Sequence, residues 1–167
     1  MTRAPRCATN SSVERTGESN EAEGEELMRE EPVRVVLADD HAGFRRGLEE
    51  MLATDEHIEV VGEAENGAQA VALVAETRPD VVLLDLAMPG MGGKEALGLI
   101  LQEVSPPPGV VILTMHDQPR QRRELLGMGA NAFLAKSASL AELIAAVKRF
   151  RPKRPPREHS GEVPPAT

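Results

Sequence analysis

The sequence contains no tryptophan or tyrosine, and phenylalanine occurs only three times in 167 residues. A core without large aromatic side chains has to be built from Val, Leu, Ile, Ala and Met, and hydrophobic residues make up 41% of the chain. Such an aliphatic core is typical of α/β domains. The length leaves room for one ordinary domain and argues against two.

Cysteine and long hydrophobic runs are also scarce. Cys7 is the single cysteine, so an internal disulfide is excluded and a reducing compartment is the simpler expectation. The most hydrophobic stretch, residues 81–86, already contains Asp85. It indicates neither a membrane span nor a signal peptide. We therefore expect a cytoplasmic protein that makes no contact with a membrane.

The chain has no excess of positive charge, and its net charge is −8. Residues 32–150 carry 17 acidic and 11 basic side chains, so this segment repels phosphate backbones and we expect no direct binding to nucleic acid. Three arginines do gather in one short stretch, Arg120, Arg122 and Arg123. They form either a solvated helix face or a protein-docking patch.

Composition divides the chain into three parts. Residues 1–31 are polar and acidic with few aliphatic side chains, and residues 151–167 contain five prolines. Neither segment can bury enough apolar surface to offset the entropy of ordering, so we expect a disordered acidic leader and a disordered Pro-rich tail. Function is then expected in one domain, residues 32–150.

Within that domain, short β-rich runs alternate with stretches of helical periodicity. The predicted strands are residues 33–38, 58–64, 81–86, 110–114 and 132–135. Apolar residues at helical spacing lie between and after them, for example Phe44, Leu48, Met51 and Leu52. Alternating βα units predict an α/β fold, a doubly wound five-stranded parallel sheet with helices on both faces. The fourth helix is the weakest, with apolar residues only at Leu125, Leu126 and Met128, which makes it a candidate moving part.

Polar residues follow or end four of the predicted strands: Asp39, Asp40, Asp85, Thr114 and Lys136. Ligands of open α/β sheets bind at the carboxyl ends of the strands. Three carboxylates brought together repel one another unless a cation joins them, so the cluster predicts a hard divalent ion, Mg²⁺. A lysine, a hydroxyl and a metal around one carboxylate suit phosphoryl transfer, with Asp85 as the nucleophile.

Residues 33–150 resemble the receiver domain of two-component response regulators, which has a flavodoxin-like (βα)5 fold. The resemblance rests on Ala38-Asp39-Asp40-His41, on Asp85 within Leu84-Asp85-Leu86-Ala87-Met88-Pro89-Gly90, and on Leu113-Thr114-Met115-His116 and Ala135-Lys136-Ser137. The flanking segments 44–48 and 129–134 resemble the NarL/FixJ-type branch in particular.

The resemblance implies a role for each matching residue. Asp85 is implied as the phosphoacceptor, with Thr114 and Lys136 binding the phosphoryl oxygens and Phe133 as an aromatic switch residue. The implied Mg²⁺ ligands are Asp85, Asp40, Asp39 through water, and the Ala87 backbone carbonyl. The implied partners are a sensor histidine kinase or phosphotransfer protein and a downstream protein target, with a homodimer as a further candidate. The chain is then a signalling domain, not an enzyme acting on a separate substrate.

Two departures from the family pattern bear on these expectations. Ser137 follows Lys136 where many receivers have a cis proline, so the peptide isomer is left open. The residues two positions beyond Asp85 and Thr114, which influence the lifetime of the acyl phosphate in the family, are Ala87 and His116. The Ala87 side chain cannot polarise an attacking water.

Several alternatives compete with this interpretation. We expect a stand-alone receiver, and the alternative is a shortened NarL-type transcriptional regulator that lacks its helix-turn-helix domain. A haloacid-dehalogenase-type phosphatase would need an acid where Ala87 stands, and an adaptor would not need the full set of polar residues. His41 and His116 suggest metal or acid/base chemistry, yet neither has a second His or Cys at ligand spacing.

Overall fold

The computed structural model describes residues 31–150. The disorder expected of residues 1–30 and 151–167 lies outside the described residues. The strands are β1 (Val33–Ala38), β2 (Ile58–Ala64), β3 (Val81–Asp85), β4 (Gly109–Thr114) and β5 (Ala132–Ala135). The helices are α2 (Ala42–Leu52), α3 (Gly67–Thr77), α4 (Gly93–Glu103), α5 (Pro119–Met128) and α6 (Leu140–Lys148). None of the described helices is long and apolar enough to span a membrane.

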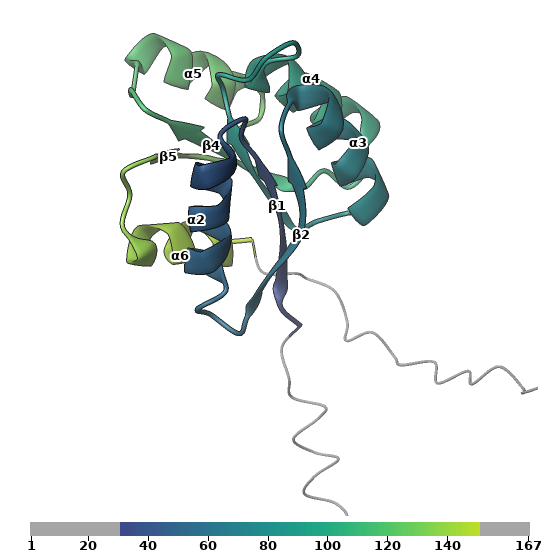
Figure 1. Ribbon diagram of the computed structural model, residues 1–167. Helices are drawn as coiled ribbons and strands as arrows, with labels where there is room; N and C mark the ends of the chain where they lie inside the picture. Colours follow the sequence, from purple (N-terminus) through teal and green to yellow (C-terminus); the bar gives the residue numbers. More distant parts are fainter. Residues whose placement is uncertain (1–30, 151–167) are drawn as a thin grey trace, which may run out of the picture.

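The strands form one parallel sheet in the order β2-β1-β3-β4-β5. The sheet lies between α2 and α6 on one side and α3 and α4 on the other (Figure 1). The predicted doubly wound five-stranded α/β fold is therefore confirmed. The connection after β1 leads to β2 on one side, and the connection after β3 leads to β4 on the other side. The strand order therefore reverses between β1 and β3, and ligands of this fold class bind beside the carboxyl ends of such a pair.

Both faces of the sheet are covered by apolar clusters, and β3 shows why. Val82 and Leu84 pack toward α3, α4 and α5, whereas Val81 and Leu83 pack toward α2 and α6. All four side chains are fully buried. Since alternate residues of a strand point to opposite faces, a strand buried on both sides needs a continuous apolar run. The apolar run of residues 81–84 is explained by this double burial.

Two strand boundaries differ from the prediction by one residue. The structure ends β3 at Asp85 where Leu86 was expected, and begins β4 at Gly109 where Val110 was expected. After Asp85 the chain turns, and the Leu86 carbonyl accepts a hydrogen bond from the Gly93 amide at 3.1 Å. A Cβ at Gly93 would collide with the Asp85 carbonyl oxygen. Glycine at this position lets α4 start directly behind the end of β3.

Helix α5 is held less firmly than its neighbour α4, as the sequence predicts. Leu125 is the one buried residue within Pro119–Met128, while Leu126 and Met128 are exposed. Helix α4 buries Gly93, Ala96, Leu97 and Ile100. An ion pair between Lys94 and Glu124 joins the surfaces of the two helices, and such an exposed pair adds little stability.

Candidate phosphoacceptor and metal site

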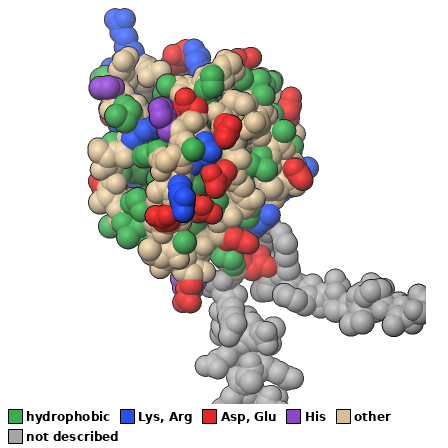
Figure 2. Space-filling view, viewed as in Figure 1, with side chains coloured by type: hydrophobic (Ala, Val, Ile, Leu, Met, Phe, Trp, Pro, Cys, Tyr) green, Lys and Arg blue, Asp and Glu red, His purple; other side chains and the backbone are tan. Residues whose placement is uncertain are grey.

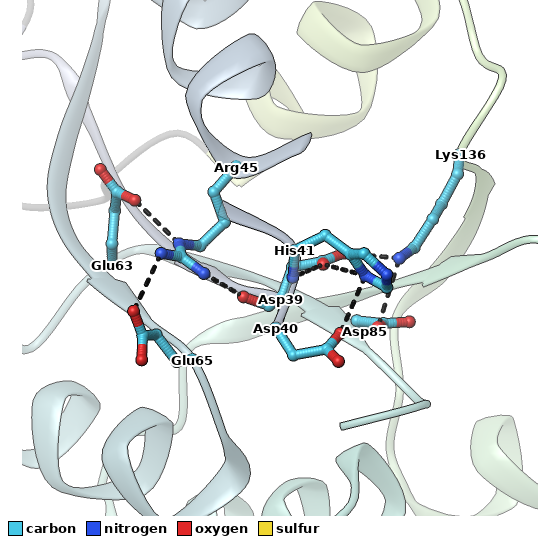
Figure 3. A network of polar contacts seen from close by, with 8 residues as sticks. All are labelled: Asp39, Asp40, His41, Arg45, Glu63, Glu65, Asp85 and Lys136. Carbon is cyan, nitrogen blue, oxygen red and sulfur yellow. Dashed lines mark hydrogen bonds and ion pairs between the residues drawn. The ribbon is translucent and has the colours of Figure 1, made fainter. Parts of the chain in front are cut away.

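The polar residues predicted at the strand ends meet at one edge of the sheet. Asp39 follows β1, Asp85 ends β3, Thr114 ends β4 and Lys136 follows β5. Asp85, Thr114, Lys136, Ala87 and His41 line one open cavity of about 340 Å³. The side chains of Asp39, Asp40, Asp85 and Lys136 point toward one another in the close-up (Figure 3).

Lys136 bridges two buried aspartates. Its Nζ donates a hydrogen bond to Asp39 Oδ2 at 2.6 Å and lies 3.2 Å from Asp85 Oδ2. The side chains of Asp39 and Asp85 are only 1% and 5% exposed. Buried carboxylates need a partner cation, and one ammonium group is shared here between two of them. The cluster keeps an excess of negative charge.

Asp85 and Lys136 form an ion pair but not a well-directed hydrogen bond. The 3.2 Å separation is close enough for an ion pair, yet Asp85 Oδ2 is buried and accepts no hydrogen bond. Both can hold, because charge attraction needs only proximity whereas a hydrogen bond also needs direction. Asp85 Oδ2 is thus held near a positive charge with its lone pairs uncommitted.

Burial raises the pKa of the Asp85 carboxyl above its ordinary value, and the charge of Asp39 adds to this rise. The Lys136 charge and a hydrogen bond from the Ala87 backbone oppose it without cancelling it. For Lys136, burial alone would lower the pKa, but its hydrogen bond to Asp39 and the charge of Asp85 outweigh burial and raise it. Lys136 therefore stays protonated at neutral pH.

Asp40 and His41 lie on the solvent side of the cluster. The Asp40 side chain is 30% exposed and its Oδ1 lies 3.0 Å from His41 Nδ1. Asp39 Oδ1 accepts a hydrogen bond from the His41 backbone N–H at 2.8 Å. Asp39 is thereby fixed through both oxygens, by Lys136 and by the chain itself, whereas Asp40 is free to meet a ligand from solvent.

Thr114 and Phe133 lie beside the cluster without touching Asp85. The Thr114 hydroxyl donates to the His116 carbonyl at 2.7 Å and accepts from the His116 N–H at 3.1 Å, so it closes a turn of its own loop. Phe133, on β5, is half-buried, and the Arg122 guanidinium lies 5.3 Å from its ring centre. Phe133 does not line the cavity, and neither do Asp39 and Asp40.

Arg45 is a residue of this region for which the sequence analysis gave no role. Its side chain is 8% exposed, and it donates to the Asp39 carbonyl at 2.6 Å and to Glu63 at 2.9 Å. Its second amino group reaches Glu65 at 3.4 Å (Figure 3). Arg45 thus fixes the backbone of the residue that anchors Lys136. Helical spacing separates it from Arg46, because Arg45 shares the buried face of α2 with Leu48 and Leu52, whereas Arg46 is 80% exposed.

The donor set fits Mg²⁺. Asp39, Asp40 and Asp85 supply carboxylate oxygens, and Asp85 Oδ2 is a buried oxygen without a hydrogen bond. Mg²⁺ prefers oxygen ligands and binds proteins through one or two carboxylates while keeping several waters. The cavity that Asp85 lines opens to solvent, so there is room for water and for a phosphoryl group beside this carboxylate. The Lys136–Ser137 peptide next to the cavity is trans, since among residues 31–150 only Ser105–Pro106 is cis.

Fold and site together define a class of protein: a doubly wound parallel α/β domain with a cluster of carboxylates and one lysine at the carboxyl edge of its sheet. The chain belongs to the response regulator receiver domain family, whose model matches residues 35–148. The resemblance seen in the sequence is thereby confirmed, and the domain is a signalling domain of two-component systems.

By sequence identity, the chain is similar to regulators of the NarL type. The chain is 39% identical over 117 residues to the probable transcriptional regulatory protein NarL of Mycobacterium tuberculosis (strain H37Rv), which covers 70% of this chain and 54% of that protein. It is 37% identical over 123 residues to the transcriptional regulatory protein DegU of Brevibacillus brevis, covering 74% and 52%. The chain spans about half the length of the curated relatives it matches.

Solved structures of receiver domains have a similar fold. The signal receiver domain of the putative response regulator NarL from Mycobacterium tuberculosis superposes with a TM-score of 0.68 at 38% identity, covering 74% of this chain and 99% of that one. The response regulator domain of Thermotoga maritima CheB gives a TM-score of 0.67 at 29% identity, covering 72% and 96%. The flavodoxin-like receiver fold is therefore established.

Proposed function

We propose that this chain is a phosphoacceptor in which Asp85 takes a phosphoryl group from a sensor histidine kinase or a phosphotransfer protein. The observation that carries the proposal is Asp85 Oδ2, a buried carboxylate oxygen with no hydrogen bond, 3.2 Å from a lysine ammonium group. A nucleophile with uncommitted lone pairs beside a fixed positive charge suits attack on phosphorus.

The chemistry is an in-line displacement. A carboxylate oxygen of Asp85 forms a bond to phosphorus, the phosphorus–nitrogen bond of a phosphohistidine breaks, and the electron pair returns to the imidazole nitrogen. Lys136 already lies within ion-pair distance of Asp85 and would neutralise charge on the phosphoryl oxygens. The product is an acyl phosphate. The domain promotes this transfer and the later hydrolysis of its acyl phosphate, and it turns over no separate substrate.

Asp40, Asp85 and the Ala87 carbonyl would hold Mg²⁺ directly, and Asp39 would hold it through water. When bound, the ion supplies positive charge to the phosphoryl oxygens. Asp39 Oδ2 is occupied by Lys136, which agrees with an indirect role for Asp39. The more exposed Asp40 can turn toward solvent and a metal without losing a buried partner.

The output would be a change at α5 and β5 recognised by a downstream protein. The Thr114 hydroxyl has to leave the His116 carbonyl before it can donate to a phosphoryl oxygen. Movement of Thr114 opens space for Phe133, and α5 is anchored by Leu125 alone within its length. Arg120, Arg122 and Arg123 are exposed on this helix, so the reshaped surface would favour an acidic partner. On the face drawn in Figure 2, basic and acidic side chains lie among one another.

Incubation with acetyl phosphate and Mg²⁺ followed by mass spectrometry tests the proposal. Wild type should gain one phosphate that hydroxylamine removes, and Asp85→Asn should gain none. Asp117→Asn is the matched control, because Asp117 is an exposed aspartate near the cavity that pairs with Arg122. Equal uptake by wild type and Asp85→Asn would show that another group accepts the phosphate. Thr114→Ala should accept phosphate at Asp85 without producing the change at α5.

The whole protein's role is part of the proposal. A shortened NarL-type transcriptional regulator remains the alternative, and the receiver chemistry proposed for residues 31–150 is the same in both cases. A second copy of the chain is a further candidate partner. We propose a cytoplasmic location, supported by the single cysteine, Cys7.

A further inference from the structure

The Phe44 ring of α2 lies against the ammonium group of Lys136. The Lys136 Nζ is 4.8 Å from the centre of the ring, within the distance of about 6 Å at which a ring face attracts a cation. The Lys136 side chain is 10% exposed, and such contacts are stronger where water is excluded. The helical spacing of Phe44 in the sequence indicates only an apolar residue of a helix.

Close packing alone does not account for the position of this ring. Phe44 packs at the edge of the apolar cluster between the sheet, α2 and α6, but it is half-buried. It lines a cavity of about 160 Å³ together with Gly43, Gly47 and Lys136. A Cβ at Gly43 or Gly47 would meet no atom within 4 Å. The ring therefore has free space beside it, and its contact with the ammonium group is one that can fix it.

The Lys136 side chain depends on several contacts for its position. The Lys136 backbone N–H donates to the Thr114 carbonyl at 2.9 Å, but the four-carbon stem is flexible. Its Nζ donates to Asp39 Oδ2 at 2.6 Å and lies 3.2 Å from Asp85 Oδ2. With the Phe44 ring, three contacts from three elements locate the ammonium group: one after β1, one at the end of β3 and one on α2.

An aromatic ring holds a cation without neutralising it. A third carboxylate would take up a hydrogen-bond donor and part of the positive charge of Lys136, whereas a ring carries no net charge and competes only weakly for N–H donors. Lys136 thus keeps charge and a donor for the oxygens of a phosphoryl group. These are the properties that phosphoryl transfer to Asp85 requires of this lysine.

The next residue of α2 acts on the partner of Lys136. Arg45 donates to the Asp39 carbonyl at 2.6 Å, and Asp39 Oδ2 accepts the hydrogen bond from Lys136 (Figure 3). Two consecutive residues of α2 therefore contact the two members of the Lys136–Asp39 ion pair, Phe44 the cation and Arg45 the anion.

We propose that Phe44 is a positioning residue for phosphoryl transfer, whose ring face holds the Lys136 ammonium group where it meets the phosphoryl oxygens on Asp85. The inference rests on the proposed function and extends it to α2. Phe44 forms no bond to the phosphoryl group and acts only through Lys136. Loss of the ring should therefore slow phosphoryl uptake without preventing it, because Asp85 and its other neighbours remain.

The initial rate of phosphate uptake from acetyl phosphate and Mg²⁺, followed by mass spectrometry on the full chain, tests the proposal. Phe44→Leu keeps an apolar side chain but removes the ring. Its uptake should slow by about tenfold, which corresponds to a cation–π contact of about 1.4 kcal/mol. Phe44→Tyr keeps the ring and should react at close to the wild-type rate. Met51→Leu is the matched control, because Met51 lines the same cavity further along α2, and it should react as the wild type does.

Fluorine substitution separates the charge contact from packing. Phenylalanine analogues with increasing numbers of ring fluorine atoms, incorporated at position 44 alone, nearly keep the shape of the ring and weaken the negative potential of its face. The uptake rate should fall with each added fluorine, which a purely structural role of Phe44 does not predict. In NMR spectra, the upfield ring-current shift of the Lys136 ε-methylene protons should be present in the wild type and absent in Phe44→Leu.

The outcomes distinguish this inference from the proposed function. Uptake by Phe44→Leu at the wild-type rate, equal slowing in Met51→Leu, or a rate that does not change with fluorine content overturns the role of Phe44 and leaves Asp85 as the phosphoacceptor. If the wild type gains no phosphate at Asp85, the proposed function is wrong and the role of Phe44 falls with it.

Discussion

The polar network at the carboxyl edge has two halves, each with one cation beside at least two carboxylates, and the halves differ in burial and in hydrogen bonding (Figure 3). In the first half, near β2, the Arg45 guanidinium contacts two carboxylates, Glu63 and Glu65, and the Asp39 carbonyl. In the second half, near β3, one lysine is shared between two buried aspartates, and Asp40 adds a third carboxylate.

Burial makes the contrast meaningful. Arg45 directs its donors at oxygen atoms on three residues, and both carboxylates of this half reach toward solvent, with 36% and 66% of their side chains exposed. Asp39 and Asp85 are almost fully buried, and Asp85 Oδ2 lacks a hydrogen bond. We call the Arg45 half matched because its excess carboxylate charge is exposed to water and its contacts are hydrogen bonds, and the Lys136 half unmatched because its excess charge is buried. A hydrogen-bonded network stabilises a fold, whereas a buried excess of one charge destabilises it until a ligand arrives. The unmatched half is therefore where we expect chemistry.

Removing the cation of the matched half should have the largest effect on stability. Arg45→Ala leaves the Asp39 carbonyl without its buried donor, so we expect the free energy of unfolding to fall by about 2 kcal/mol. Arg46→Ala is the matched control: Arg46 lies one position along the same helix, and we expect a change within about 0.5 kcal/mol. Urea denaturation of both variants measures the difference. Equal losses would mean that the Arg45 contacts contribute nothing specific.

Adding a cation to the unmatched half should stabilise the protein. A ligand that binds only the folded state at ten times its Kd raises the free energy of unfolding by about 1.4 kcal/mol. We expect Mg²⁺ to do so in the wild type and not in Asp40→Ala, while Asp117→Ala, which alters an exposed aspartate outside the cluster, keeps the effect. Thermal denaturation with and without Mg²⁺ decides this. Full Mg²⁺ stabilisation of Asp40→Ala would exclude Asp40 as a ligand.

Removing a charge from the unmatched half should stabilise the metal-free protein. Because the pKa of Asp85 is raised in the folded state, mainly by burial, the folded protein binds the proton more tightly than the unfolded chain does. The penalty for ionising Asp85 is thus absent below the unfolded pKa of 3.8, grows as pH rises from there to the folded pKa, and is complete above it. Asp85→Asn escapes this penalty.

We therefore expect Asp85→Asn to be more stable than the wild type at pH 7 without metal, by on the order of 1 kcal/mol. The advantage should shrink as pH falls toward 4, because Asp85 becomes protonated in the wild type. Urea denaturation at a series of pH values measures it. An advantage that stays constant with pH would contradict a raised pKa for Asp85.

Much of the fold could be predicted from the sequence because burial on both faces of a parallel sheet leaves a strong pattern. The apolar run before Asp85 identified β3 within one residue of its end, and the sparse apolar residues of segment 119–128 identified the weakly anchored α5. The strand ends that carry the acidic residues then followed from chain order, so the meeting of Asp39, Asp85 and Lys136 could also be predicted.

What the sequence could not predict depends on side-chain direction. Helical spacing puts Arg45 on the buried face of α2, but it does not say that the guanidinium reaches Glu63 and the Asp39 carbonyl. His41 offers no ligand spacing by itself, and its proximity to two carboxylates depends on the turn between β1 and α2. Such contacts follow from rotamers and backbone turns that residue type and periodicity do not specify.

A third arginine, Arg122, makes weaker contacts than Arg45 and can therefore let go of its partners when the protein switches. Arg122 has one carboxylate partner, Asp117 at 2.5 Å, and lies over the Phe133 ring. Its side chain is 46% exposed, so this contact should be far weaker than those of Arg45. An exposed cation–π contact contributes about 0.5 kcal/mol, which corresponds to roughly a twofold shift in a two-state equilibrium.

We expect Arg122→Gln to free Phe133 slightly and to move the unphosphorylated protein toward the active state, because the guanidinium holds the ring in its present position. In NMR spectra, resonances of residues 118–135 should then lie part of the way toward the positions they take with a beryllofluoride phosphoryl mimic. Arg123→Gln is the control, since Arg123 is exposed on the same helix and no ring contact of it is found in residues 31–150. Identical spectra for the two variants would remove Arg122 from the switch, and silence of residues 118–135 in the wild type with beryllofluoride would remove the switch itself.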